Sequence, residues 1–106
     1  MSSAEPLRVL MVCLGNICRS PTAQGVLSSL ASKRAFKRDI LVDSAGTGSW
    51  HLGEAPDERS IEAAARRGYE IDHLVSRQIT IIDFEKFDYV LAMDQANLDD
   101  LKKLCL

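Results

Sequence analysis

An unbroken run of apolar residues, Val9 to Cys13, constrains the fold of this chain more than any other feature. A strand with one solvated face alternates apolar and polar residues, whereas a continuous run is typical of a strand buried on both faces of a parallel sheet. A short polar segment follows Cys13, and Pro21 then suits the first turn of a helix, where its missing N–H loses no hydrogen bond. The sequence therefore predicts a buried strand that leads through a loop into a helix.

The rest of the chain alternates between predicted strands and helices. The predicted elements are an amphipathic helix from Pro21, a strand at Ile40–Val42, a loop at Asp43–Gly53, a helix from Pro56 to Gly68, a single turn capped by Thr80 with Asp83, a strand at Tyr89–Met93 and a helix capped by Asp94. This alternation favours right-handed crossovers and an α/β fold, a doubly wound parallel sheet, in one domain over residues 1–106. Ligands of such sheets bind beyond the carboxyl ends of the strands, and Cys13 ends the first strand.

The segment from Cys13 to Pro21 lies where free backbone N–H groups and the helix dipole attract an anion. Five residues separate Cys13 from Arg19, enough for the backbone to curl around one tetrahedral anion while the guanidinium binds two of its oxygens. Gly15 and Asn16 are the residue types that most readily accept a positive φ, which a tight loop requires. The pattern predicts a phosphate-binding loop.

Cys13 is the predicted nucleophile of this loop. A free cysteine titrates at pH ~8.5, but helix N-terminal amides, a guanidinium such as Arg19 and a hydroxyl such as Ser20 all favour the thiolate. The alternative is that Cys13 is an ordinary buried thiol of the core. The strand before the loop, the residues inside it and the helix start after it together favour the catalytic interpretation.

The sequence resembles the low-molecular-weight protein tyrosine phosphatases, whose signature near the N-terminus is a cysteine, five residues, then arginine and serine. Further stretches similar to the family are Asp43–Thr47, Arg77–Thr80 and Phe87–Asp94. The resemblance implies a three-layer sandwich of which three of the family's four strands are present. It also implies hydrolysis of a tyrosine-phosphorylated protein or a small aryl phosphate, with no cofactor and no metal.

The resemblance assigns a role to each residue of the site. Cys13 attacks phosphorus, Arg19 binds the phosphoryl oxygens and Ser20 stabilises the thiolate. The phosphate-binding residues between them are Leu14, Gly15, Asn16, Ile17 and Cys18, the residues that support the loop are Ser44 and His73, and the aromatic residue of the substrate cleft is Trp50. Without the resemblance, His73 is interpreted as a solvated loop residue and Trp50 as a partly buried one.

The family's general acid is an aspartate followed directly by proline on a later loop. The 106 residues contain no such pair, because their prolines are Pro6, Pro21 and Pro56. Protonation of a leaving group typically contributes ~10²- to 10⁴-fold to the rate, so we expect a C-terminally shortened form with impaired turnover. Asp94 is the one candidate for a substitute acid, although helix capping already explains an aspartate there.

The shortened form predicts further properties. The family's last strand, acid loop and final helix are absent, so we expect self-association through an uncovered sheet edge. A net charge of −2 indicates no nucleic-acid partner. The absence of a long apolar run indicates no membrane partner, and we expect a cytoplasmic protein.

Two other functions compete with hydrolysis. One is phosphate or phosphotyrosine binding without efficient turnover, and the other is arsenate reduction, which needs a thiol relay although only Cys105 lies outside the loop.

Overall fold

A computed structural model describes residues 5–34 and 38–105 of the chain. Three parallel strands form one sheet in the order β2-β1-β3, with bounds Leu7–Cys13 for β1, Ile40–Gly46 for β2 and Tyr89–Ala92 for β3. Val9 of β1 lies opposite Val42 of β2 and Tyr89 of β3. The central strand is therefore the one that carries the apolar run, which confirms the predicted parallel sheet.

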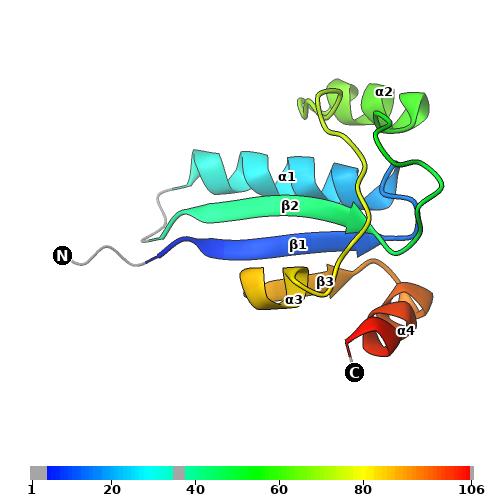
Figure 1. Cartoon of the computed structure of the whole chain (residues 1–106). Coiled ribbons are helices and arrows are strands. Elements are labelled where there is room, and N and C mark those ends of the chain that lie inside the picture. Colours follow the sequence, from blue (N-terminus) through cyan, green and yellow to red (C-terminus); the bar gives the residue numbers. More distant parts are fainter. Residues whose placement is uncertain (1–4, 35–37, 106) are drawn as a thin grey trace.

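Helices lie on both sides of this sheet. The helices are α1 at Arg19–Lys33, α2 at Glu58–Arg66, α3 at Asp83–Lys86 and α4 at Gln95–Leu104. Figure 1 shows α1 and α2 above the sheet and α3 and α4 below it. The order of elements and the layers confirm a doubly wound α/β fold with three layers.

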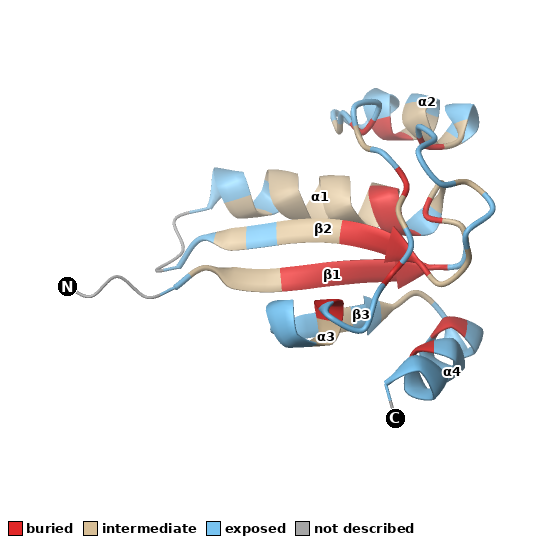
Figure 2. Ribbon diagram, viewed as in Figure 1, coloured by how far each residue is buried: buried red, intermediate tan, exposed pale blue. Residues whose placement is uncertain are grey.

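The core is concentrated at the carboxyl ends of β1 and β2, the arrowhead ends in Figure 2. The five residues from Val9 to Cys13 are all buried, as expected for a strand that is covered on both faces. Leu10 and Val12 are fully buried and form a cluster with Ala45, Ile79 and Leu101. The residues that precede the loop from Cys13 to Ser20 thus belong to the hydrophobic core of the described structure.

The second strand is longer than the sequence predicted. It continues from Ile40 to Gly46 in register with β1, whereas the polar residues from Asp43 onward predicted a loop. Ser44 is buried and hydrogen-bonds to Asn16 and Gln24, whereas the Asp43 side chain is 46% exposed and pairs with Arg77. A strand with polar residues at its end is stable here because their hydrogen bonds are satisfied within the protein.

The ends of α2 and α4 agree with local capping rules. The Asp94 side chain accepts a hydrogen bond from Asn97 N at 2.8 Å, which confirms the predicted cap of α4. The second helix begins at Glu58, two residues after the predicted start, because Asp57 provides the cap by accepting from Arg59 N. Gly68 follows this helix with φ 87°, a left-handed conformation that suits glycine at a helix end.

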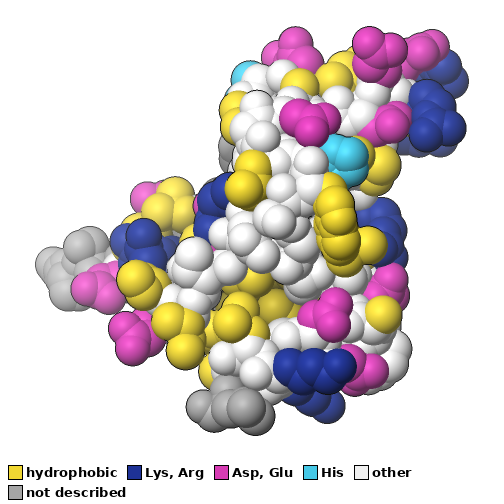
Figure 3. Space-filling model, turned by 45° about the vertical axis from the view of Figure 1, so that its right-hand side comes forward, with side chains coloured by type: hydrophobic (Ala, Val, Ile, Leu, Met, Phe, Trp, Pro, Cys, Tyr) yellow, Lys and Arg dark blue, Asp and Glu magenta, His cyan; other side chains and the backbone are white. Residues whose placement is uncertain are grey.

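Part of the lower layer is open to solvent. β3 is an edge strand on which Tyr89 and Leu91 are exposed, and Leu98 and Leu104 of α4 are exposed as well, whereas Leu101 is buried. Figure 3 shows hydrophobic side chains gathered in the lower half of the molecule. Within the described ranges, no helix has both the length and the apolar character needed to cross a bilayer.

The burial of Leu10 predicts a large effect on stability. Replacing it by alanine, Leu10→Ala, leaves a cavity beneath the central strand and should lower the free energy of unfolding by about 2–5 kcal/mol. Leu41→Ala is the matched control, because Leu41 lies on the same sheet but is 48% exposed. Urea unfolding of both variants tests the expectation, and equal losses for the two would contradict the assignment of the core.

Candidate active site

Cys13 lies buried at the carboxyl end of β1, and the loop after it folds back over its sulfur. The backbone N–H of Asn16 donates to Cys13 Sγ at 3.2 Å. Ser20 Oγ lies 3.0 Å from the same sulfur. The predicted nucleophile therefore has two polar hydrogen-bond partners although its residue is only 3% exposed.

Asn16 holds the loop in shape. Its φ is 57°, the left-handed conformation that asparagine tolerates, and it is 2% exposed. Its side-chain amide donates to Ser20 Oγ at 2.8 Å and to Ser44 Oγ at 2.9 Å, while its carbonyl oxygen accepts from Arg77 N at 3.0 Å. One side chain thus joins the loop, the start of α1, the end of β2 and the segment before α3.

The direction of these hydrogen bonds determines what Ser20 can do. Its oxygen accepts from the amide of Asn16, so its own proton is free to point at Cys13 Sγ. The hydroxyl of Ser44 accepts from the same amide and donates to Gln24 Oε1 at 2.6 Å, and Gln24 in turn donates to a backbone carbonyl of β2. This arrangement presents a hydroxyl donor to the sulfur, where it would stabilise negative charge.

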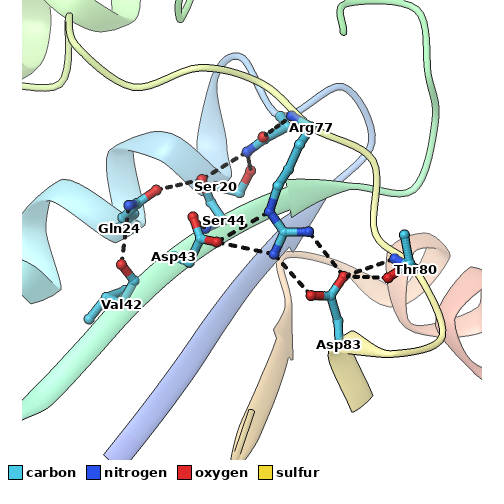
Figure 4. A network of polar contacts seen from close by, with 9 residues as sticks. Ser20, Gln24, Val42, Asp43, Ser44, Arg77, Thr80 and Asp83 are labelled. Carbon is cyan, nitrogen blue, oxygen red and sulfur yellow. Dashed lines mark hydrogen bonds and ion pairs between the residues drawn. The ribbon is translucent and has the colours of Figure 1, made fainter. Parts of the chain in front are cut away.

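Arg77 anchors the segment between α2 and α3, whose backbone donates a hydrogen bond to Asn16. Figure 4 shows its guanidinium between two carboxylates, at 3.1 Å from Asp43 and 3.0 Å from Asp83. Burial alone would raise the pKa of the Asp83 carboxyl, but hydrogen bonds from Arg77 and Thr80 outweigh burial and hold that pKa below its ordinary value. The two ion pairs fix the position of the Arg77 backbone, which donates to Asn16.

The same segment lies along the end of β2. Gly46 N donates to Arg77 O at 2.8 Å, and Ile79 N donates to Gly46 O at 2.8 Å. A side chain at Gly46 would place its Cβ 2.7 Å from the backbone oxygen of Leu14, so only glycine permits this approach. The end of β2, the loop from Cys13 to Ser20 and the Arg77 segment are therefore packed directly against one another.

Arg19 lines the same cleft as Cys13 and is held from the lower layer. Its Nη1 lies 2.7 Å from Asp94 Oδ2, and about half of each side chain is exposed. The hydrogen bond from Arg19, with the backbone N–H groups at the start of α4, holds the pKa of Asp94 below its ordinary value. Asp94 is therefore ionised at neutral pH and a poor proton donor, which argues against it as a substitute acid.

The cleft above the sulfur has a volume of about 290 Å³. Its walls are the loop from Cys13 to Arg19 on one side and the pair Trp50 and His51 on the other. Trp50 is 70% exposed, and its ring lies so close to Gly48 that any side chain there would overlap it. The sequence did not point to His51, which contacts Glu54 at 3.2 Å, because a histidine in a polar loop carries no pattern of its own.

The structure does not bring His73 to the loop. Its side chain is 68% exposed, and its nearest charged partner is Asp72 at 3.9 Å. Within residues 5–34 and 38–105, no hydrogen bond joins His73 to the loop from Cys13 to Ser20, and the Asn16 carbonyl oxygen accepts from the backbone N–H of Arg77. Loop support comes instead from Ser44 and Arg77, and from Gln24 through Ser44.

Comparison with known proteins agrees with this geometry. Residues 8–105 match the family model described as low molecular weight phosphotyrosine protein phosphatase. The chain is 43% identical over 98 residues to the low molecular weight protein-tyrosine-phosphatase YfkJ of Bacillus subtilis, a match that covers 92% of the chain and 63% of YfkJ. It is 46% identical over 103 residues to the low molecular weight phosphotyrosine protein phosphatase of Homo sapiens, which covers 97% of the chain and 65% of the human protein.

The solved structures give the same answer. The crystal structure of YfkJ from Bacillus subtilis superposes with a TM-score of 0.92 at 41% identity, covering 97% of this chain and 65% of that one. The chain belongs to the low molecular weight phosphotyrosine protein phosphatase family. It spans slightly less than two thirds of the length of these relatives.

The pairing of Asp83 with Arg77 predicts a pH-dependent stability. The folded pKa of Asp83 lies below its ordinary value, so its contribution is present above pH ~3.9 and is lost as the pH falls through the folded pKa. Asp83→Asn should therefore lower the free energy of unfolding by about 1.5–3 kcal/mol at neutral pH and by much less in acid. Urea unfolding at neutral pH and in acid measures the difference in the free energy of unfolding between Asp83→Asn and the original chain. Asp100→Asn, at an exposed position, is the control, and a gap that persists unchanged in acid would contradict the pairing.

Proposed function

We propose that this chain hydrolyses phosphotyrosine through a cysteinyl-phosphate intermediate at Cys13. The observation that supports the proposal is the position of Cys13 Sγ at a cleft lined by Arg19, with Ser20 Oγ at 3.0 Å and Asn16 N at 3.2 Å. These are the parts that a thiolate nucleophile and a phosphate cradle require. Family membership supports the same reaction class.

The reaction proceeds in two steps in this proposal. The Cys13 thiolate attacks phosphorus, an S–P bond forms and the P–O bond to the phenol breaks. Water then attacks the phosphocysteine, the S–P bond breaks, and inorganic phosphate leaves with the thiolate restored. The Ser20 hydroxyl stabilises the departing thiolate in the second step, since its proton is free to point at the sulfur.

Arg19 and the loop backbone bind the phosphoryl oxygens in this proposal. The guanidinium can bind two oxygens at once, and its ion pair with Asp94 holds it at the cleft. The backbone from Leu14 to Cys18 surrounds the remaining oxygens. Cys18 is also the N-cap of α1, and its side chain makes no capping hydrogen bond within the part of the chain described, so the first amides of α1 are available to an anion.

The cleft favours an aryl phosphate over a shorter ester. Cys13 is buried at 3% exposure, whereas Trp50 at the mouth is 70% exposed, so a substrate must reach inward past the ring. A tyrosyl side chain is long enough to do so and flat enough to stack on an indole. A seryl or threonyl phosphate is shorter and offers no ring for Trp50.

Turnover by the 106 residues alone is expected to be slow for ordinary phenolic esters. They contain no Asp-Pro pair, and the carboxylate of Asp94 is tied to Arg19 with a lowered pKa. A phenolate that leaves without protonation departs slowly unless its own pKa is low. The second candidate function is therefore phosphotyrosine binding without efficient turnover, which the same cleft would support.

Burst kinetics on p-nitrophenyl phosphate test the nucleophile. This ester has an activated leaving group, so we expect release of one equivalent of p-nitrophenol by the chain, followed by slower turnover. Cys13→Ser should abolish both phases of p-nitrophenol release, and it should still bind vanadate, although more weakly than the original chain. Cys105→Ser, at an exposed thiol, is the control. Release that persists in Cys13→Ser would overturn the mechanism. Vanadate binding without release would instead favour the binding function.

We also propose that the 106-residue chain self-associates through β3. This strand is an edge of the sheet, with Tyr89 and Leu91 exposed at 56% and 42%. An apolar edge that no other described strand pairs with favours pairing with a second chain.

Sedimentation velocity measures the expected self-association. Leu91→Lys should shift the chain toward monomer, because a charge on an edge strand opposes pairing. Leu41→Lys places the same charge on β2, the other edge of the sheet, and serves as the control. A monomer at all concentrations would contradict the proposal, and so would an equal effect of the two variants.

A further inference from the structure

A second cavity lies beside the cleft, between α1 and α2. Its volume is about 530 Å³, larger than the roughly 290 Å³ of the cleft itself. We call it the α1–α2 groove and define it by six of its lining residues: Cys18, Val26, Arg59, Ala63, Arg67 and Tyr69. Cys18 lines the cleft as well, so the two cavities share a wall at the phosphate-binding loop.

The second helix gives the groove a direction. Its cap residue Asp57 donates its backbone N–H to Ile17 O at 2.7 Å, so the helix begins at the loop, and it ends at Arg66. The nine residues of α2 rise about 13 Å. An extended peptide covers about 3.3–3.6 Å per residue, so about four residues would span the distance from the loop end of the groove to Arg67.

Charge is distributed unevenly along α2. Arg59 pairs with Asp57 at 3.2 Å, and Arg66 pairs with Glu62. Arg67 is exposed and donates only to the backbone oxygen of Ala63 at 3.2 Å, and among the described residues it has no carboxylate partner. The far end of the groove therefore carries a guanidinium whose charge no carboxylate of the described residues neutralises.

We propose that the α1–α2 groove binds the peptide on one side of the phosphotyrosine, and that Arg67 selects an acidic residue about four positions away. This inference rests on the proposed function, because it requires the phosphate to lie in the cleft above Cys13. Val26 and Ala63 supply an apolar wall for the peptide, and a carboxylate is the group that complements an unpaired guanidinium. Arg67 is a binding residue for the substrate and takes no part in the chemical step.

Peptides with a non-hydrolysable phosphotyrosine analogue test this proposal without requiring turnover. Each peptide carries the difluorophosphonate analogue of phosphotyrosine in an alanine and serine background, with one Glu or one Lys placed three to five residues away on either side. Fluorescence anisotropy at low salt gives the affinity of the 106-residue chain for each peptide. On one side of the phosphotyrosine analogue only, we expect the peptide with Glu to bind about two- to fivefold more tightly than the peptide with Lys. This is the range for an exposed ion pair.

Variants of neighbouring arginines make the test specific. Arg67→Gln should remove the preference for Glu, whereas Arg66→Gln should retain it, because Arg66 is already paired with Glu62. Both side chains are exposed, so both variants should unfold at the same temperature as the original chain. A preference for Glu that survives in Arg67→Gln overturns the proposal, and so does the absence of any preference on both sides.

Vanadate distinguishes this failure from a failure of the proposed function. Vanadate competes for the cleft above Cys13 and not for the groove. A peptide that vanadate displaces, yet that shows no preference for Glu, overturns the groove alone. A peptide that vanadate does not displace contradicts phosphate binding at Cys13, and with it both the proposed function and this inference.

Discussion

The hydrogen bonds of one buried side chain, Asn16, are the constraint on which the site depends. Its amide and carbonyl reach Ser20, Ser44 and Arg77, which belong to three different segments of the chain. A buried polar group that loses its partner costs about 1–3 kcal/mol, so each segment is held where its hydrogen bond is satisfied. The positive φ of Asn16 is maintained by the same contacts. The shape of the loop and the packing of the three segments are therefore a single property of the structure.

Arg77 extends this constraint across the sheet. The segment that carries it descends from the upper layer to α3 in the lower layer, as Figure 1 shows, and its two ion pairs join it to β2 and to α3. Arg19 makes a second connection of the same kind, because it lies at the start of α1 and pairs with the cap of α4. Elements on both faces of the sheet thus contribute charged side chains near the carboxyl ends of the strands, where the cleft opens.

Local patterns in the sequence were sufficient for some of these features and not for others. The buried strand before Cys13 and the cap at Asp94 each follow from a few adjacent residues, and the structure confirms them. The end of β2 does not, because Asp43 is polar and becomes compatible with a strand only through Arg77, far along the chain. The support role of His73 stays a prediction, because its exposed side chain makes no hydrogen bond with the loop among the described residues. The support that the structure does show includes the backbone N–H of Arg77, which donates to the Asn16 carbonyl, and no residue type reveals a backbone donor.

The long sequence separations within the cradle have a consequence for folding. Asn16 contacts Ser44 and Arg77 across 28 and 61 residues, so the cradle exists only after most of the sheet has assembled. The unfolded chain has no equivalent site, and an anion held there would bind the native state alone. Each tenfold rise in the anion concentration above the dissociation constant would add about 1.4 kcal/mol to the free energy of unfolding. The phosphate content of its surroundings would then influence what fraction of the chain is folded, apart from any reaction it performs.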